Sequence, residues 1–386
     1  MTAWQVKGWC PGALRPMASG DGLIVRVRPP GGRLSPAQAE AIARAALAHG
    51  NGIIDLSARA NLQLRGVTEA SHGPLIADLR AHGLIDPDIE TEQLRNLIVT
   101  PFRPASSYID ALTAVLTAAL AQMPPLPGKF GFALDCGPRP VLSGASADIR
   151  VERAADGQLI LRPDGYGLGR VVNDLAQDAV SLAQWFAASG GVTDGRGRMA
   201  ALIGRGVVPP GCDTAPAQPL PQPLPQPAPG PHAEGVLVAL AFGQMRAETL
   251  IALAALGHEL RPTPWRMLFL AAATQIPAIA ELVTDPAEPL LRVTACTGAP
   301  GCPQALGQTR TLARSLAALV PAGSVLHVSG CAKGCAHPGP ADLTLIASPR
   351  GFGLVRGGTA SDTPMQTGLS PADLPDLLKA PHAPPL

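Results

Sequence analysis

Two stretches decide the fold: "VTACTGAPGCPQALGQTR", Val293 to Arg310, and "VLHVSGCAKGCAHPG", Val325 to Gly339. Together they hold four of the seven cysteines. Five residues separate Cys296 from Cys302, and three separate Cys331 from Cys335. Four soft thiolates can hold zinc or a 4Fe-4S cluster. Structural zinc sites more often use cysteine pairs with two residues between them, so the spacing favours iron-sulfur. Zinc and four unrelated buried thiols remain the alternatives.

We expect a helix and a strand between the two cysteine pairs. Pro303 would open the helix and the segment 321–323 would end it, with a buried face made by Leu306, Ala313, Leu316 and Val320. Cys302 would then lie just before a helix N-terminus, where partial positive charge favours a thiolate or a negatively charged cluster. A strand over 325–329 would deliver Cys331 at its end.

The two halves of the chain repeat one order of elements. The strand-like segments "GLIVRVR" (22–28) and "GVLVALAF" (235–242) each lead into a helix. Ser35 and Gln38 form a capping box for the first helix, which ends near 49–52. The second helix is expected over about 246–256.

Two further pairs of strands match between the halves, 96–101 with 291–296 and 147–151 with 341–346. Self-similarity at half the chain length predicts a duplicated α+β unit with a pseudo-twofold axis. A ligand would then lie where the halves meet.

Composition bounds the classes of function. The formal net charge of the 386 residues is +1, which does not suggest binding to nucleic acid. We expect a cytoplasmic protein, because we find no signal peptide and no apolar run long enough to cross a membrane. Seven cysteines in a reducing compartment indicate metal or redox use. Most basic residues are arginines, which grip carboxylates with paired hydrogen bonds, so a pocket for a polyanionic small molecule is available.

A proline-rich stretch over 208–232 predicts a semi-rigid linker, with Cys212 as a bystander. The segment "ARANLQLRG" (58–66) alternates strictly and predicts a strand with Arg59, Asn61, Gln63 and Arg65 on one face. In isolation, a solvated polar face is the commoner interpretation of this pattern. Arg26 and Arg28 also share one face of their strand, and surface exposure is an equal alternative for them.

The four-cysteine arrangement resembles the sulfite and nitrite reductase superfamily, in which duplicated halves sandwich a tetrapyrrole beside a 4Fe-4S cluster. Within it, the segments 10–35, 129–137 and 327–338 are similar to the precorrin-3B synthase family. The resemblance implies an α+β fold of ferredoxin-like half-domains (1–90 and 233–288), two α/β reductase-like domains (91–207 and 289–386, the latter binding the cluster) and the linker (208–232).

The resemblance also implies a site. Cys296, Cys302, Cys331 and Cys335 would hold the cluster, and Arg59, Asn61, Gln63, Arg65, Arg95 and Lys129 would bind the tetrapyrrole carboxylates. One departure is informative, since reductases with sirohaem commonly carry a second lysine where this chain has Gly131. Its loss argues against reduction of sulfite or nitrite.

The chemistry implied is oxygen-dependent hydroxylation and lactone formation on precorrin-3A in aerobic cobalamin biosynthesis. Dioxygen, an external NAD(P)H-linked electron donor, the 4Fe-4S cluster and a mononuclear non-haem iron would take part. No catalytic residue is assigned. Lys333 and His337 are the candidates, and His337 and Asp342 are the candidate ligands of the iron. The alternatives are a sirohaem-dependent nitrite or sulfite reductase and a zinc-stabilised binding protein.

Overall fold

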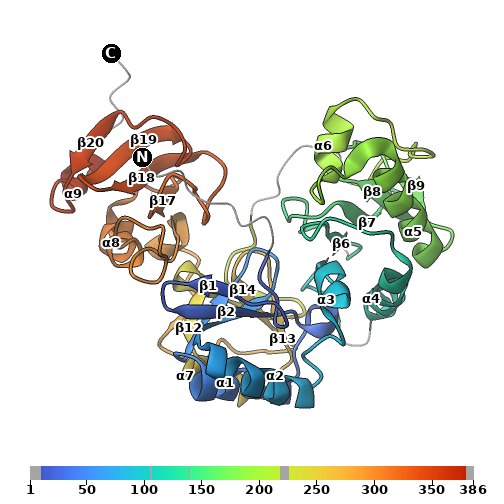
Figure 1. The fold of residues 1–386 in the computed structure, drawn as a ribbon, viewed down its shortest axis with the longest axis horizontal. Coiled ribbons are helices and arrows are strands. Elements are labelled where there is room, and N and C mark those ends of the chain that lie inside the picture. Colours follow the sequence, from blue (N-terminus) through green and yellow to red (C-terminus); the bar gives the residue numbers. More distant parts are fainter. Residues whose placement is uncertain (1–9, 105–106, 138, 218–225, 380–386) are drawn as a thin grey trace.

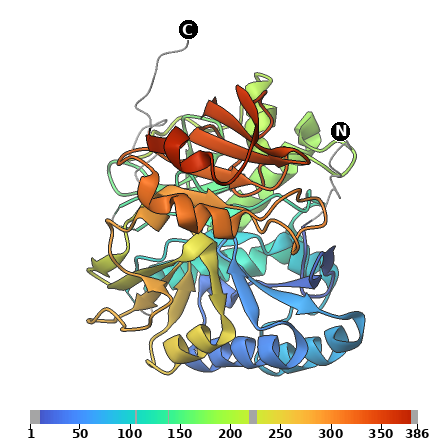
Figure 2. The same cartoon turned by 90° about the vertical axis from the view of Figure 1, so that its left-hand side faces the viewer.

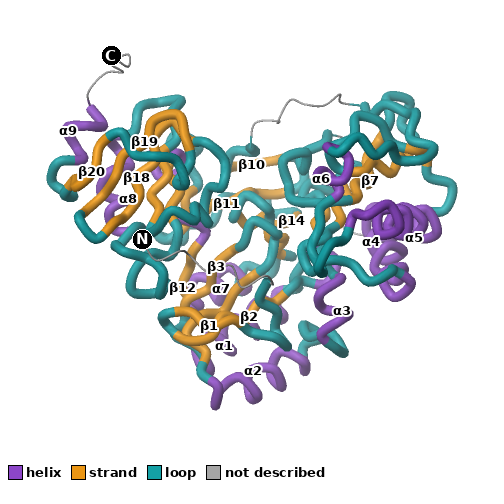
Figure 3. The backbone as a smooth tube through the Cα atoms, turned by 45° about the horizontal axis from the view of Figure 1, so that its top comes forward, coloured by secondary structure: helices purple, strands orange, loops and turns teal. Residues whose placement is uncertain are grey.

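The computed structural model describes residues 10–104, 107–137, 139–217 and 226–379. A central body carries helices α1, α2 and α7 along one face, and two α/β lobes stand on its opposite side (Figures 1 and 2). The first lobe is green in Figure 1 and the second is orange and red. Figure 3 shows the strands in three groups, one in each lobe and one in the central body.

The central body contains two sheets. The first has the order β1-β2-β4-β3-β12, formed by Met17–Ser19, Gly22–Val27, Leu62–Val67, Ile53–Leu56 and Gln244–Arg246. Helices α1 (Pro36–His49) and α2 (Glu69–Ala81) belong to this half. The capping box predicted at Ser35 and Gln38 is confirmed, and α1 ends at His49 as expected. Apolar side chains of the strands and helices form a shared core, including Val25, Leu64 and Ile42.

The second central sheet has the order β10-β11-β14-β13, with β15 also paired to β11. Its strands are Gly230–His232, Gly235–Leu240, Met267–Ala271, Leu260–Pro262 and Leu282–Val283. Helix α7 (Ala247–Ala254) packs against α1, so the helices of both halves share one layer.

The two halves exchange short segments reciprocally. Strand β12 of the second half pairs with β3 of the first, and Leu34 of the first half pairs with Leu260 of the second. The turns before β4 and β14 also repeat: the Ser57 amide donates to Asn61 O at 2.9 Å, and the Thr263 amide donates to Met267 O at 3.0 Å. The predicted duplication of reductase-like halves is therefore confirmed.

Each lobe holds one sheet in which two parallel pairings are followed by antiparallel ones. The first lobe contains β5 (Leu97–Val99), β6 (Phe132–Leu134), β7 (Ile149–Arg153), β8 (Leu159–Pro163) and β9 (Arg170–Val171), with α3 (Ile89–Leu94), α4 (Tyr108–Ala119), α5 (Leu175–Phe186) and α6 (Met199–Gly204). The second contains β16 (Val293–Ala295), β17 (Leu326–Ser329), β18 (Ala341–Ser348), β19 (Gly351–Gly358) and β20 (Gln366–Leu369), with α8 (Arg310–Leu316) and α9 (Leu374–Lys379).

The helix predicted to begin at Pro303 is wrong. Helix α8 begins at Arg310, and Leu306 is 54% exposed instead of buried. The intervening backbone forms loop contacts: the Leu306 amide donates to Gly330 O at 2.8 Å and the Ala299 amide to Gly307 O at 2.9 Å. Cys302 therefore lies in a loop and not at a helix N-terminus.

The strand predicted over 58–66 is also shorter than expected. Strand β4 begins at Leu62, and Ala60 has a left-handed φ of 55°, so Arg59 and Asn61 belong to the preceding turn. Only Gln63 and Arg65 alternate along the strand itself.

The proline-rich segment leaves the first lobe along its sheet. Thr214 pairs with Gly169, and the Ala217 amide donates to Arg153 O at 2.7 Å. Of the linker predicted over 208–232, residues 218–225 lie outside the described residues, and Gly230–His232 form strand β10. No helix in the described ranges is long and apolar enough to cross a membrane.

Candidate functional site

The cysteine loops meet at one edge of the second lobe's sheet. Strands β16 and β17 are parallel neighbours, and Cys296 and Cys331 follow their carboxyl ends. The Gly330 amide donates to the Cys296 sulfur at 3.2 Å. Because the Leu306 amide bonds to Gly330 O, the loop that carries Cys302 also lies against the loop before Cys331.

The four thiols affect one another electrostatically. Burial raises the pKa of the Cys335 thiol, and the neighbouring Cys331, Cys296 and Cys302 raise it further, whereas Lys333 lowers it. All four cysteines are free. Four thiolates at these positions would repel one another, and bound metal cations would relieve this repulsion.

The four cysteines lie on adjoining loops and are not gathered around a single point. In the described part of the chain, no three His, Cys, Asp or Glu side chains are close enough together to hold one metal ion. A tetrahedral zinc site needs sulfurs about 3.8 Å apart, given Zn–S bonds of about 2.3 Å. A cubane cluster takes the same four thiolates at a wider spacing and at its separate corners.

The described residues do not fit the expected mononuclear iron. Such a centre needs histidine and carboxylate ligands that converge on one point, and no group of three does so among these residues. Nε2 of His337 is within 3.1 Å of Pro340 O, and Asp342 accepts a hydrogen bond from the Val325 amide at 2.7 Å.

A row of polar side chains crosses the first central sheet from strand to strand. Arg26, Gln63, Asp55 and Gln244 are cross-strand neighbours in register. Arg26 donates to Gln63 Oε1 at 2.7 Å, and Gln244 donates to Asp55 Oδ1 at 3.0 Å. The apolar neighbours Val25, Leu64 and Ile54 point the other way, into the core.

One end of this row is a desolvated cluster of arginines. Arg26 is 8% exposed, and burial lowers its pKa to about 10. Burial also lowers the pKa of Arg28 and of Arg59, and these guanidiniums repel Arg26 and one another. Within the described ranges neither Arg26 nor Arg59 forms an ion pair, and Arg26 Nη1 and the nearby Asn61 Nδ2 are buried without a hydrogen-bond partner. Buried hydrogen-bond donors that lack an acceptor can bind an anion.

Two of the arginines predicted to bind the ligand already have carboxylate partners. Arg65 binds Asp21 at 2.7 Å and Asp55 at 3.1 Å. Arg95 binds both oxygens of Asp86 at 2.8 Å. Both guanidiniums are therefore already neutralised by carboxylates, and their predicted contact with the ligand stays a prediction. Lys129 is exposed, and its carbonyl accepts a hydrogen bond from Arg59.

The other end of the polar row joins the second lobe. Asp55 binds Arg310 of α8 at 3.2 Å as well as Arg65. Arg65 Nη2 also donates to Gly301 O at 3.1 Å, directly before Cys302. Sequence reasoning missed Asp55 and Arg310, because their pairing joins residues 255 positions apart and leaves no local pattern.

Arg59 fills the space beside Gly131. A Cβ atom at position 131 would lie 3.1 Å from Asn96 O and 3.4 Å from Arg59 Nη1. The Arg59 guanidinium, which donates to Lys129 O at 3.0 Å and to Ser146 Oγ at 3.1 Å, therefore lies in van der Waals contact with the position that a side chain at residue 131 would enter.

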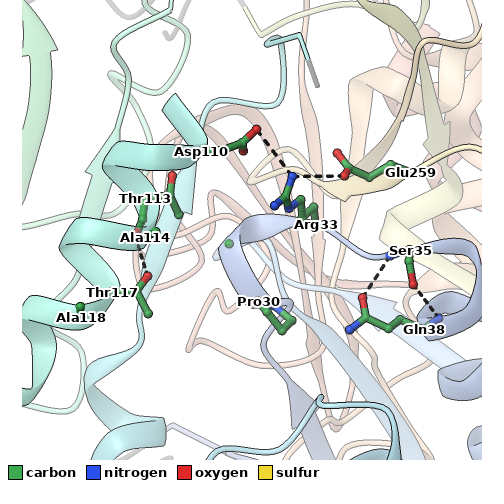
Figure 4. Close-up of a pocket in the computed structure, with 11 residues that line it drawn as sticks. Pro30, Arg33, Ser35, Gln38, Asp110, Thr113, Ala114, Thr117, Ala118 and Glu259 are labelled. Carbon is green, nitrogen blue, oxygen red and sulfur yellow. Dashed lines mark hydrogen bonds and ion pairs between the residues drawn. The ribbon is translucent and has the colours of Figure 1, made fainter. Parts of the chain in front are cut away.

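A separate open pocket of about 700 Å³ lies between η1 (Pro30–Gly32), the start of α1 and helix α4. Figure 4 shows Arg33 between the carboxylates of Asp110 and Glu259, at 3.6 and 3.5 Å. None of the predicted site residues lines this pocket, so we place no part of the expected chemistry there.

Comparisons with known proteins agree with this architecture. Residues 15–82 match the nitrite/sulfite reductase ferredoxin-like half domain. The structure of the Mycobacterium tuberculosis NirA protein aligns with a TM-score of 0.65 at 17% identity, covering 92% of this chain and 79% of that one. The fold is thus that of the nitrite and sulfite reductases.

A curated relative is more specific. Precorrin-3B synthase from Sinorhizobium sp. is 31% identical over 417 aligned positions, which cover 93% of this chain and 84% of the relative. The chain belongs to the precorrin-3B synthase family.

Proposed function

We propose that the protein is a precorrin-3B synthase, an oxidoreductase that hydroxylates precorrin-3A and closes a lactone in aerobic cobalamin biosynthesis. One atom of dioxygen enters the product and the other leaves as water, with two electrons from an external NAD(P)H-linked donor. Membership of the family supports the substrate. The observation that carries the proposal is that Arg26 and Arg59 have no carboxylate partner within the described ranges, because the substrate is a polycarboxylate.

The arginine cluster binds and orients the macrocycle in this proposal. Buried Arg26 and half-buried Arg59 offer guanidinium donors on one side of the central body, and Asn61 adds a buried amide. Arg28 beside them is paired with Glu92 at 3.0 Å. Charge-assisted hydrogen bonds from arginine to carboxylate are strong and directional, so they fix the ring position. Because the folded protein already shields these arginines from water, less free energy is needed to remove water from them when the substrate binds.

Cys296, Cys302, Cys331 and Cys335 would hold a 4Fe-4S cluster, which when bound passes electrons one at a time toward the substrate. The cysteine loops adjoin Asp55, and Asp55 is two strands from Arg26 in the polar row. At roughly 4.8 Å per strand this separation is about 10 Å. The polar row thus leads from the proposed carboxylate site to Asp55 and Arg65, which contact the second lobe at Arg310 and Gly301.

The reductase alternative is less well supported. Sirohaem enzymes need basic groups for a small oxyanion, and the position of their second lysine is Gly131 here, with Arg59 beside it. Arg59 instead extends the set of groups suited to carboxylates.

The test is to purify the protein without oxygen, measure iron and sulfide, record the visible spectrum and extract pigment. We expect about four iron and four sulfide per chain, broad absorbance near 400 nm and no sirohaem. Cys335→Ser should lose the cluster, whereas Cys212→Ser, at a buried free cysteine on the proline-rich segment, should retain it. Sirohaem in the extract would establish the reductase alternative, and a colourless protein that binds zinc stoichiometrically would contradict both.

A further inference from the structure

Arg266 has an unusual backbone and no ion pair within the described ranges. It lies in the turn between β13 and β14 with a left-handed φ of 61°. Residues with a Cβ atom avoid this region, and exceptions cluster at functional sites. The side chain is half-buried, and burial lowers its pKa.

The turn itself does not require an arginine. In the first half, Ala60 occupies the same position with a φ of 55°. Its amide donates to Ser57 O at 3.0 Å, as the Arg266 amide donates to Thr263 O at 3.2 Å. Since alanine suffices for the turn, the Arg266 side chain must be explained by what it contacts.

The side chain reaches the cysteine loop of the second lobe. Nη2 of Arg266 donates to Ala336 O at 3.2 Å, directly after Cys335. Gly243 makes this approach possible, because a Cβ atom there would lie 2.6 Å from Arg266 Cβ. Arg266 also interacts electrostatically with Cys335 and with Cys296, on the adjacent loop.

We propose that Arg266 positions the loop of Cys331 and Cys335 and places a fixed positive charge beside the cluster, raising its reduction potential. The inference rests on the cluster of the proposed function. Reduction adds a negative charge to the cluster, and a nearby cation stabilises that state more than the oxidised one. Asp55 and Arg310 lie in the same network and partly offset each other. Lys333 is a second cation beside Cys335, and Arg266 differs from it in being half-buried and held by its hydrogen bond to Ala336 O.

The experiment is a potentiometric titration of the cluster, followed by electron paramagnetic resonance, in the full-length protein. Arg266→Gln should make the equilibrium constant for one-electron reduction about tenfold less favourable, a shift of about 59 mV. Arg266→Lys keeps the charge and should stay within about twofold of the unmodified protein. Arg44→Gln is the matched control, because Arg44 is an exposed arginine on α1 that pairs with Glu40.

Two results would overturn the inference. One is an unchanged potential in Arg266→Gln with full iron and sulfide content. The other is an equal shift in the lysine and glutamine variants, which would assign the effect to loop geometry instead of charge. If Arg266→Gln does not retain its cluster, the test rests on Arg266→Lys. Full cluster content in Arg266→Lys, with a reduction potential near that of the unmodified protein, supports the inference. A larger shift of the potential in Arg266→Lys overturns it. An unmodified protein without a cluster contradicts the proposed function itself, and this outcome is distinguished by the iron and sulfide content.

Discussion

The substitution Asp55→Asn tests whether the central body and the second lobe are held together by one buried carboxylate. The Asp55 side chain is 7% exposed and binds Arg65 at 3.1 Å and Arg310 at 3.2 Å, from opposite sides of the domain contact. Asparagine keeps one accepting oxygen but removes the charge. Removing one partner of a buried pair costs about 3–5 kcal/mol, and the remaining partner Asp21 of Arg65 reduces this loss.

We therefore expect Asp55→Asn to lower the free energy of unfolding by about 3 kcal/mol. The assay is urea unfolding followed by circular dichroism. Asp21→Asn is the control, since Asp21 is 23% exposed and its loss leaves Arg65 paired with Asp55; it should cost about 1 kcal/mol. The double variant Asp55→Asn/Arg310→Gln should lose less free energy of unfolding than the sum of the losses in the two single variants. A decrease of less than about 0.5 kcal/mol in the free energy of unfolding of Asp55→Asn would show that this carboxylate does not hold the central body and the second lobe together.

Three further predictions concern the cysteine lobe and the first helix. Burial lowers the pKa of His327 to about 4, with His337 and Arg266 adding to the effect. The unfolded chain binds this proton near pH 6.5, so stability falls between pH 6.5 and 4, and His327→Leu should remove up to about 3 kcal/mol of that fall in urea titrations at both pH values. Gly330→Ala places a Cβ atom 2.7 Å from Ala305 Cβ and 3.4 Å from Cys296 Sγ, so we expect about 1–3 kcal/mol of destabilisation and reduced iron content, and normal values for both would contradict the tight packing. Ser35→Ala removes the cap of α1 and should cost about 1 kcal/mol in thermal unfolding, whereas Ser35→Thr should recover most of it.

Local signals in the sequence predict much of the fold. The capping box at Ser35 specifies where α1 begins, because its partners lie within three residues of each other. The duplicated strands are also readable, since each carries its own β-branched pattern. The wrong helix prediction has a non-local cause. The Leu306 amide donates to Gly330 O of another loop, so residues 303–309 form loop contacts and no helix.

The candidate site divides in the same way. The cysteines and the polar face around Gln63 and Arg26 are visible as spacing and alternation. Which arginines are free is not visible, because Arg65 is neutralised by Asp21 and Asp55 through contacts that only the folded chain creates. Spacing alone could not show that Arg59 fills the space beside Gly131.

The most direct test of the central claim is to supply the purified protein with precorrin-3A, an NAD(P)H-linked reductase system and ¹⁸O₂, and to weigh the product by mass spectrometry. We expect a product that contains one ¹⁸O atom, and no turnover of nitrite or sulfite under the same conditions. Unchanged precorrin-3A together with reduction of nitrite or sulfite would contradict it.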